Sequence, residues 1–221
     1  MPSIGAANVG DLVGICQDSS RDPKDRALAC SLLGWIGTRE VIDILLNVAH
    51  SAEEAILVWE AIAAVGTIQS KRVTRHLIEV IRSKSSTIKR QASIYALSLL
   101  GDERARACLE RVLLDPEELP QSRGMAAEAL GLLRLRSRTS RALVLMLDNP
   151  SAEVRYSCLC ALGALRDESA LRHIEHLTGD LGSLEGEGTV AERAQLVIHD
   201  IREAIERTRE SPASASSVTR S

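Results

Sequence analysis

The sequence predicts an all-α solenoid, in which helical hairpins stack side by side into a right-handed superhelix. Segments of one length recur along the chain and end at residues 37, 66, 101, 134 and 166, about 32 residues apart, a period typical of helical-hairpin repeats. Hydrophobic residues make up 45% of the chain but aromatic residues only 2%. The core must therefore consist of aliphatic side chains, which favours helices over sheets.

The recurring segments align without gaps. They are KDRALACSLLGWIG (24–37), EEAILVWEAIAAVG (53–66), IKRQASIYALSLLG (88–101), QSRGMAAEALGLLR (121–134) and EVRYSCLCALGALR (153–166). In each segment, apolar residues spaced one, three and four apart form one stripe of an α-helix. The third residue from the end is always small (Gly34, Ala63, Ser98, Gly131 and Gly163), so we expect neighbouring helices to approach closely there.

A second set of helices is predicted between these segments, because apolar residues also recur at helical spacing in 42–46, 77–81, 109–113, 143–147 and 171–177. Each repeat is thus a helix pair. We predict one domain over 1–207, with repeats at 8–37, 38–66, 67–101, 102–134 and 135–166 and a C-terminal cap at 167–207, whose helix 189–207 closes the stack. Residues 179–188 are expected to form a Gly-rich acidic loop, and 208–221 a disordered tail.

The last repeat carries a family resemblance. Residues 148–177, DNPSAEVRYSCLCALGALRDESALRHIEHL, resemble the HEAT-like repeat of the phycobilin-lyase type, and the likeness extends over roughly 8–180. The resemblance implies that the second helix of each repeat lines a concave surface. It also implies a structural ladder in which recurring arginines bond to acceptors in the turns between repeats (Arg26, Arg90, Arg123 and Arg155). Ala55 stands at this position in the second repeat, which weakens the ladder there.

The sequence lacks the common catalytic motifs. It has no phosphate-binding G-x-x-x-x-G-K, no strand-flanked G-x-G-x-x-G and no G-x-S-x-G elbow. His173 and His176 are expected on a solvated helix face rather than around a metal. Deoxyhypusine hydroxylases, a HEAT-like enzyme family, bind iron through paired His-Glu dipeptides, and this chain has none. We therefore predict no catalytic residue, no cofactor and no metal, and a protein that is not an enzyme.

The net charge of the chain limits the classes of partner that it would attract. The net charge of −3 gives no general attraction for nucleic acid or anionic lipid. Four arginines (Arg134, Arg136, Arg138 and Arg141) crowd the turn before the fifth repeat, which is interpreted as solvated, with anion binding as the alternative.

The odd number of cysteines (Cys16, Cys30, Cys108, Cys158 and Cys160) is typical of reduced, mostly buried thiols. With no signal peptide or apolar span, a cytoplasmic location without membrane insertion is expected.

A partner surface is predicted on the second helices, opposite their core stripe. Tyr95 and Tyr156 point along this side, and Glu60 and Glu128 add negative charge there. Trp59 lies at the flank of the core stripe, where it either joins this surface or fills the space between repeats. Aromatic rings are enriched at interaction surfaces, and the carboxylates favour a segment rich in lysine or arginine. The first hypothesis is a non-enzymatic scaffold, adaptor or regulatory subunit that binds another protein. The alternatives are a bilin lyase or isomerase subunit and, less favoured by the charge, a DNA-binding solenoid.

Overall fold

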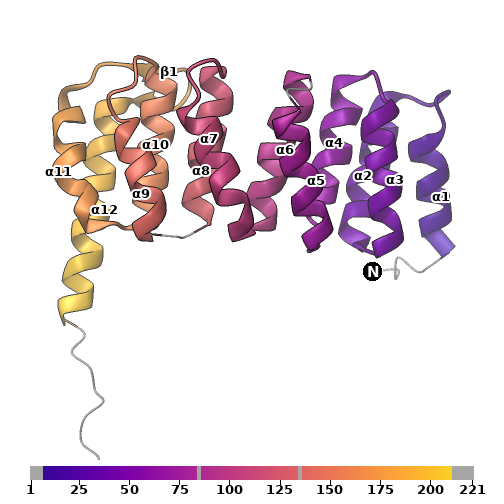
Figure 1. Ribbon diagram of the computed structural model, residues 1–221, viewed down its shortest axis with the longest axis horizontal. Helices are drawn as coiled ribbons and strands as arrows, with labels where there is room; N and C mark the ends of the chain where they lie inside the picture. The colour runs from indigo at the N-terminus through magenta and orange to yellow at the C-terminus, as the bar shows by residue number, and fades with distance from the viewer. Residues whose placement is uncertain (1–6, 84–85, 134–135, 211–221) are drawn as a thin grey trace, which may run out of the picture.

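The protein is an all-α solenoid in the computed structural model, which describes residues 7–83, 86–133 and 136–210. Successive helix pairs stand side by side along the long axis of the molecule (Figure 1). The prediction of an all-α solenoid is therefore confirmed.

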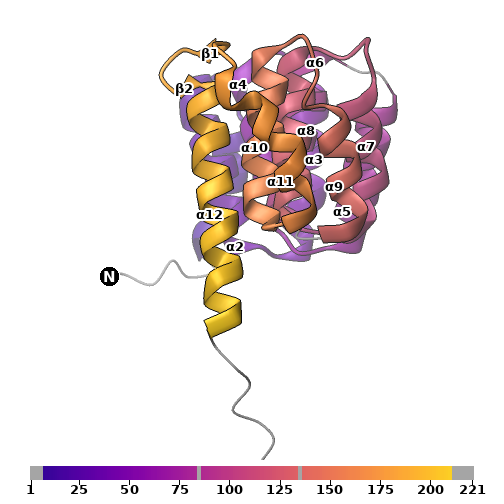
Figure 2. The same cartoon turned by 90° about the vertical axis from the view of Figure 1, so that its left-hand side faces the viewer.

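The helices form two rows. The first helices of the repeats are α1 (Ala7–Gln17), α3 (Arg39–Ser51), α5 (Lys71–Arg82), α7 (Arg106–Leu114) and α9 (Arg136–Leu145). The second helices are α2 (Pro23–Ile36), α4 (Ala55–Gly66), α6 (Thr87–Leu100), α8 (Pro120–Leu132) and α10 (Ala152–Leu165). We number these pairs repeats 1 to 5. Viewed from the end, α2 and α4 lie on one side of the stack and α5, α7 and α9 on the other (Figure 2).

A sixth unit completes the stack. It comprises a short first layer, made of η2 (Glu168–Ala170), α11 (Leu171–Ile174) and η3 (Glu175–Gly179), and the long helix α12 (Val190–Glu210). Helix α12 packs against α10 and thus extends the row of second helices by one member. A further short helix, η1 (Glu103–Ala105), leads into α7.

Glycines set the spacing between successive second helices. A Cβ added at Gly34 of α2 would lie 2.8 Å from the Cβ of Ala64 on α4. One added at Gly131 of α8 would lie 2.8 Å from the Cα of Ala161 on α10. Because real Cβ atoms do not approach this closely, only glycine lets the helix backbones meet at these points. The predicted close approach is confirmed at both positions.

The segment after the fifth repeat differs from its prediction as a plain loop. β1 (Ser183–Leu184) and β2 (Gly188–Thr189) form a two-stranded antiparallel hairpin that pairs Ser183 with Thr189. Gly186 and Gly188 take positive φ values of 80° and 93°, which L-residues with a Cβ rarely adopt. The glycines therefore allow a tight turn that folds back over α10 rather than a free linker.

The arginine-rich segment, the cysteines and the C-terminal tail differ in how well they match their predictions. Helix α9 begins at Arg136 and includes Arg138 and Arg141, so the predicted arginine-rich turn is wrong for these three residues. Arg134 lies outside the described residues. Four cysteines are buried and free, and Cys160 is half-buried, as expected. The predicted tail mostly lies outside the described residues, since α12 continues to Glu210. Among the described residues, no helix combines the length and the hydropathy that a membrane span requires.

Candidate functional site

The recurring arginines join the two rows of helices. Arg26 donates from Nε to the carbonyl of Cys16 at 3.2 Å, and Arg123 donates from Nε to the carbonyl of Leu113 at 2.9 Å. Arg90 donates from Nη1 to the carbonyl of Ile81. Each of these carbonyls belongs to the penultimate residue of the preceding first helix, where a helix leaves its carbonyls without intrahelical donors. The recurring arginine contacts that the family resemblance implies are present, but their carbonyl acceptors lie at the end of the first helix of the same repeat and not in the turns between repeats.

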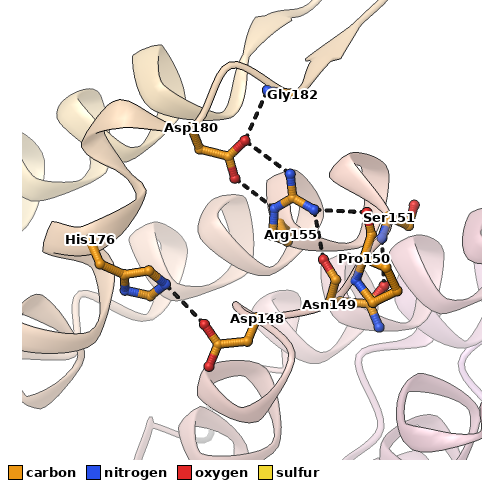
Figure 3. Close-up of polar contacts among 8 residues, drawn as sticks. All are labelled: Asp148, Asn149, Pro150, Ser151, Arg155, His176, Asp180 and Gly182. Carbon is orange, nitrogen blue, oxygen red and sulfur yellow. Dashed lines mark hydrogen bonds and ion pairs between the residues drawn. The ribbon is translucent and has the colours of Figure 1, made fainter.

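The ladder also bonds to the following repeat. Arg26 lies 3.7 Å from the carboxylate of Glu54, and Arg90 pairs with Glu118. Arg155 makes a bidentate pair with Asp180, at 2.7 Å through Nε and 2.9 Å through Nη2. Figure 3 shows its guanidinium between Asp180 and the turn before α10, where Nη1 donates to the carbonyls of Asn149 (2.6 Å) and Pro150 (3.0 Å). The arginine holds the pKa of Asp180 below its usual range, because it stabilises the carboxylate.

The junction between repeats 2 and 3 is built differently. Ala55 supplies no guanidinium, and the equivalent penultimate carbonyl, that of His50, accepts instead from Nζ of Lys89 at 3.3 Å. At the same junction, the rings of Trp59 and Tyr95 stack, with centroids 5.7 Å apart and planes at 27°. A lysine from the following repeat and an aromatic stack thus take the place of the arginine contact.

The residues predicted for partner binding also bridge neighbouring second helices. Glu60 accepts a hydrogen bond from Ser31 Oγ at 2.8 Å, and Glu128 accepts one from Ser157 Oγ at 3.0 Å. In both pairs the residues are 29 positions apart, so they join one repeat to the next. Glu128 is exposed, and Glu60 is half-buried.

The prediction that Tyr156 points to an open surface is wrong. Its side chain is only 5% exposed, because the hairpin and α12 cover it. The hydroxyl donates to the carbonyl of Glu187 at 3.1 Å, and the guanidinium of Arg193 lies over the ring, 4.7 Å from its centroid, and donates to the hydroxyl. Tyr156 therefore closes the C-terminal end of the solenoid and is not available to a partner.

Other exposed apolar side chains on the second helices were not predicted from the sequence. Trp35 (84% exposed), Leu99 (41%) and Leu132 (58%) stand at equivalent positions in repeats 1, 3 and 4. Leu99 lies one turn after Tyr95, and Leu132 one turn after Glu128, so each pair shares a helix face. Their shared position, two residues before the end of a recurring segment, is the sequence signal that could have identified them. Together with the four accessible predicted residues they form the second-helix surface (Trp35, Trp59, Glu60, Tyr95, Leu99, Glu128 and Leu132).

The histidines predicted on a solvated face point to different neighbours. His173 accepts from Nε of Arg172 at 3.0 Å, whereas His176 lies 3.1 Å from Asp148 of the preceding repeat (Figure 3). Across the described ranges, no three His, Cys, Asp or Glu side chains lie together as a metal site would require. The donors present therefore do not fit an iron centre of the hydroxylase kind. Burial also raises the pKa of the Cys108 and Cys158 thiols, which disfavours nucleophilic thiolates there.

An α-solenoid is defined by these features: stacked helical hairpins, arginines that join the two rows of helices, and close glycine contacts between neighbouring helices. Residues 12–98 match the family model described as HEAT repeats, and residues 154–180 match the PBS lyase HEAT-like repeat. The chain is a HEAT-like repeat protein.

Solved structures share this fold at low sequence identity. The Escherichia coli protein YibA has a TM-score of 0.60 and 19% identity, with 94% of this chain and 83% of that chain covered. Human deoxyhypusine hydroxylase in complex with glycerol has a TM-score of 0.50 and 22% identity, with 90% and 75% covered. The complex of CpcE and CpcF of phycocyanin lyase from Nostoc has a TM-score of 0.50 and 18% identity, with 89% and 83% covered. These likenesses establish the fold alone.

A curated relative corrects the functional prediction. Deoxyhypusine hydroxylase-B of Oryza sativa subsp. japonica is 27% identical over 136 residues, which cover 62% of this chain and 44% of the relative. This chain therefore matches less than half of that protein's length. Because the relative is an enzyme, the expectation of a non-enzymatic scaffold, adaptor or regulatory subunit is overturned. Because the likeness to phycocyanin lyase shows the fold alone, neither the bilin lyase alternative nor the DNA-binding alternative is retained.

Proposed function

We propose that the second-helix surface binds an amine-bearing segment of a protein substrate, as the substrate-binding part of a HEAT-like enzyme. The observation that carries this proposal is the stacked pair Trp59 and Tyr95 in the same row of helices as the carboxylates of Glu60 and Glu128. Aromatic faces attract ammonium groups, and carboxylates form charge-assisted hydrogen bonds with them.

Charge and exposed apolar area support the same class of ligand. The hydrogen bonds from Ser31 and Ser157 orient the two carboxylates, and each carboxylate has acceptor capacity beyond one hydroxyl. Leu99 and Leu132 extend the surface with apolar side chains that a polar solute would not cover. A segment with both amines and apolar side chains therefore complements it better than a small cation does. The relative's name gives deoxyhypusine, an amine-bearing residue, as what that enzyme acts on.

A direct test uses a fluorescently labelled amphipathic peptide of leucine and lysine, with glutamate replacing lysine in a matched peptide. Anisotropy should show binding of the lysine peptide alone, and binding should weaken with added salt. The E60Q/E128Q double variant should bind it roughly tenfold more weakly, through loss of two charge-assisted contacts. A peptide carrying deoxyhypusine in place of a central lysine should bind at least as well as the lysine peptide.

The matched control is the E40Q/E79Q double variant, which removes two exposed carboxylates from the first helices α3 and α5. It should bind the lysine peptide like the unmodified chain. Equal binding of the lysine and glutamate peptides, or equal weakening by both double variants, would refute the proposal.

We also propose a cytoplasmic location. Its support is that the five cysteine thiols are free and four of them are buried, as expected in a reducing compartment. Fractionation of the native cell, followed by detection of the chain in the cytoplasmic and other fractions, tests it.

A further inference from the structure

A cleft lies between the first helices α3 and α5, away from the second-helix surface. Its volume is about 580 Å³, within the range of roughly 300–1,000 Å³ that small-molecule sites occupy. One wall is the face of α3 that carries Asp43, Asn47 and His50. The other wall is the face of α5 that carries Arg72 and His76, and residues of α4 and α6 complete the lining.

The cleft coincides with the junction that lacks a ladder arginine. In repeats 1, 3 and 4, a guanidinium bonds to the penultimate carbonyl of the first helix. In repeat 2 that carbonyl belongs to His50, which lines the cleft, and Ala55 leaves the space near it without a guanidinium. Lys89 enters from α6 and contacts the carbonyl at 3.3 Å, the long end of a hydrogen bond.

The two ends of the cleft differ in charge. At one end, Arg72 and Asp43 neutralise each other through contacts of 2.5 and 3.2 Å. At the other end, Lys89 lies beside Ser93 and the C-terminus of α3, and its ammonium carries three donors for the one carbonyl contact just described. Between the ends, buried Ile62 and Leu77 and half-buried Leu46 give an apolar lining. A cation therefore lies at one end of a cleft whose middle is lined by apolar side chains.

We propose that this cleft is a binding site for a small organic anion, an aliphatic or aryl carboxylate. The carboxylate contacts Lys89, and the apolar body lies against Leu46, Ile62 and Leu77. The site shares no residue with the second-helix surface, so its ligand is separate from the protein substrate proposed above.

Octanoate is a suitable probe, because it has one carboxylate and an apolar chain. Calorimetry should show saturable binding of one octanoate per chain, with shifts in the imidazole NMR signals of His50 and His76. Acetate, which lacks the chain, and octylamine, which has the opposite charge, should each bind at least about tenfold more weakly. Binding of octylamine as tightly as octanoate would refute the assignment of an anion site.

Two variants locate the site. K89Q removes the ammonium and should weaken octanoate binding at least about tenfold, whereas K71Q, at an exposed lysine of α5 outside the cleft, should leave it unchanged. L46W fills the cleft from a half-buried position without changing charge and should abolish binding. Circular dichroism and melting should match the unmodified chain for each variant. Equal loss in K71Q and K89Q, or undiminished binding in L46W, would overturn the proposal.

Discussion

The junction between repeats 1 and 2 and the junction between repeats 2 and 3 solve the same packing problem with different residues. In the first, Arg26 bonds to the carbonyl of Cys16 and lies near Glu54. In the second, Ala55 and Lys89 stand where Arg26 and Glu54 stand in the alignment of the repeats. The first junction closes with a charge pair, and the second leaves a cleft that is lined in part by Lys89.

This difference indicates that the arginine contacts stabilise the turns, whereas the helices pack against one another without them. Leu57, Leu77, Ile94 and Leu97 around the second junction are as fully buried as the core elsewhere. Apolar burial supplies the main driving force there, so the arginine position is free to vary where a neighbouring residue satisfies the carbonyl.

The largest effect is expected at the fifth junction. R155A removes a bidentate partner from Asp180 and a donor from the carbonyls of Asn149 and Pro150. The pair is about 15% exposed, and breaking a largely buried pair costs about 3 kcal/mol. Urea unfolding followed by circular dichroism measures this loss. R202A, at a surface pair with Glu175, should cost under about 0.5 kcal/mol; equal losses would contradict the ladder's structural role.

A smaller effect is expected from pH, since it removes only the Asp180 side of the same contact. Arg155 lowers the folded-state pKa of Asp180 below the unfolded value of about 3.9. The contact therefore contributes fully above the unfolded pKa, and its contribution is lost as pH falls through the folded pKa. The unfolding free energy of the chain should exceed that of D180N by a constant amount above about pH 5, and the difference should shrink in acid. A difference that grows toward low pH would exclude this account.

Restoring the ladder at the second junction should raise stability modestly. The A55R/K89E double variant supplies a guanidinium for the carbonyl of His50 and a carboxylate partner, worth about 1 kcal/mol. A55R alone should gain less, because its guanidinium lies beside the Lys89 ammonium. Thermal unfolding of the single and double variants gives the coupling between the two positions. The double variant should also lose octanoate binding, and retention of binding would separate the cleft from the missing arginine.

The smallest effect is expected for the aromatic contact of the second junction. Y95A removes the stack on Trp59, which contributes about 0.5–1 kcal/mol beyond the buried area. Y95F keeps the ring and should match the unmodified chain in urea unfolding. A loss in Y95F as large as in Y95A would show that the hydroxyl, rather than the stack, stabilises this junction.

Much of the candidate surface could be predicted because it follows the repeat. Glu60 and Glu128 occupy the same place in their segments, and a side chain's place in the segment determines its helix face. Tyr156 has a favourable place by the same rule, yet it is buried. The hairpin that covers it occurs once among the described residues, so the repeat pattern of the sequence does not predict it.

The recurring arginine contacts were implied by the family resemblance. The helix pairs, their core stripes and the close contacts at Gly34 and Gly131 could be predicted from the amino-acid sequence. These features depend on local spacing, and the helical period converts spacing directly into direction. Three features could be seen only in the folded chain: Tyr156 is covered, Lys89 takes the place of the missing arginine, and a cleft lies beside Lys89. Those depend on which non-repeating side chains meet across junctions, and such contacts are set by the packing of whole helices.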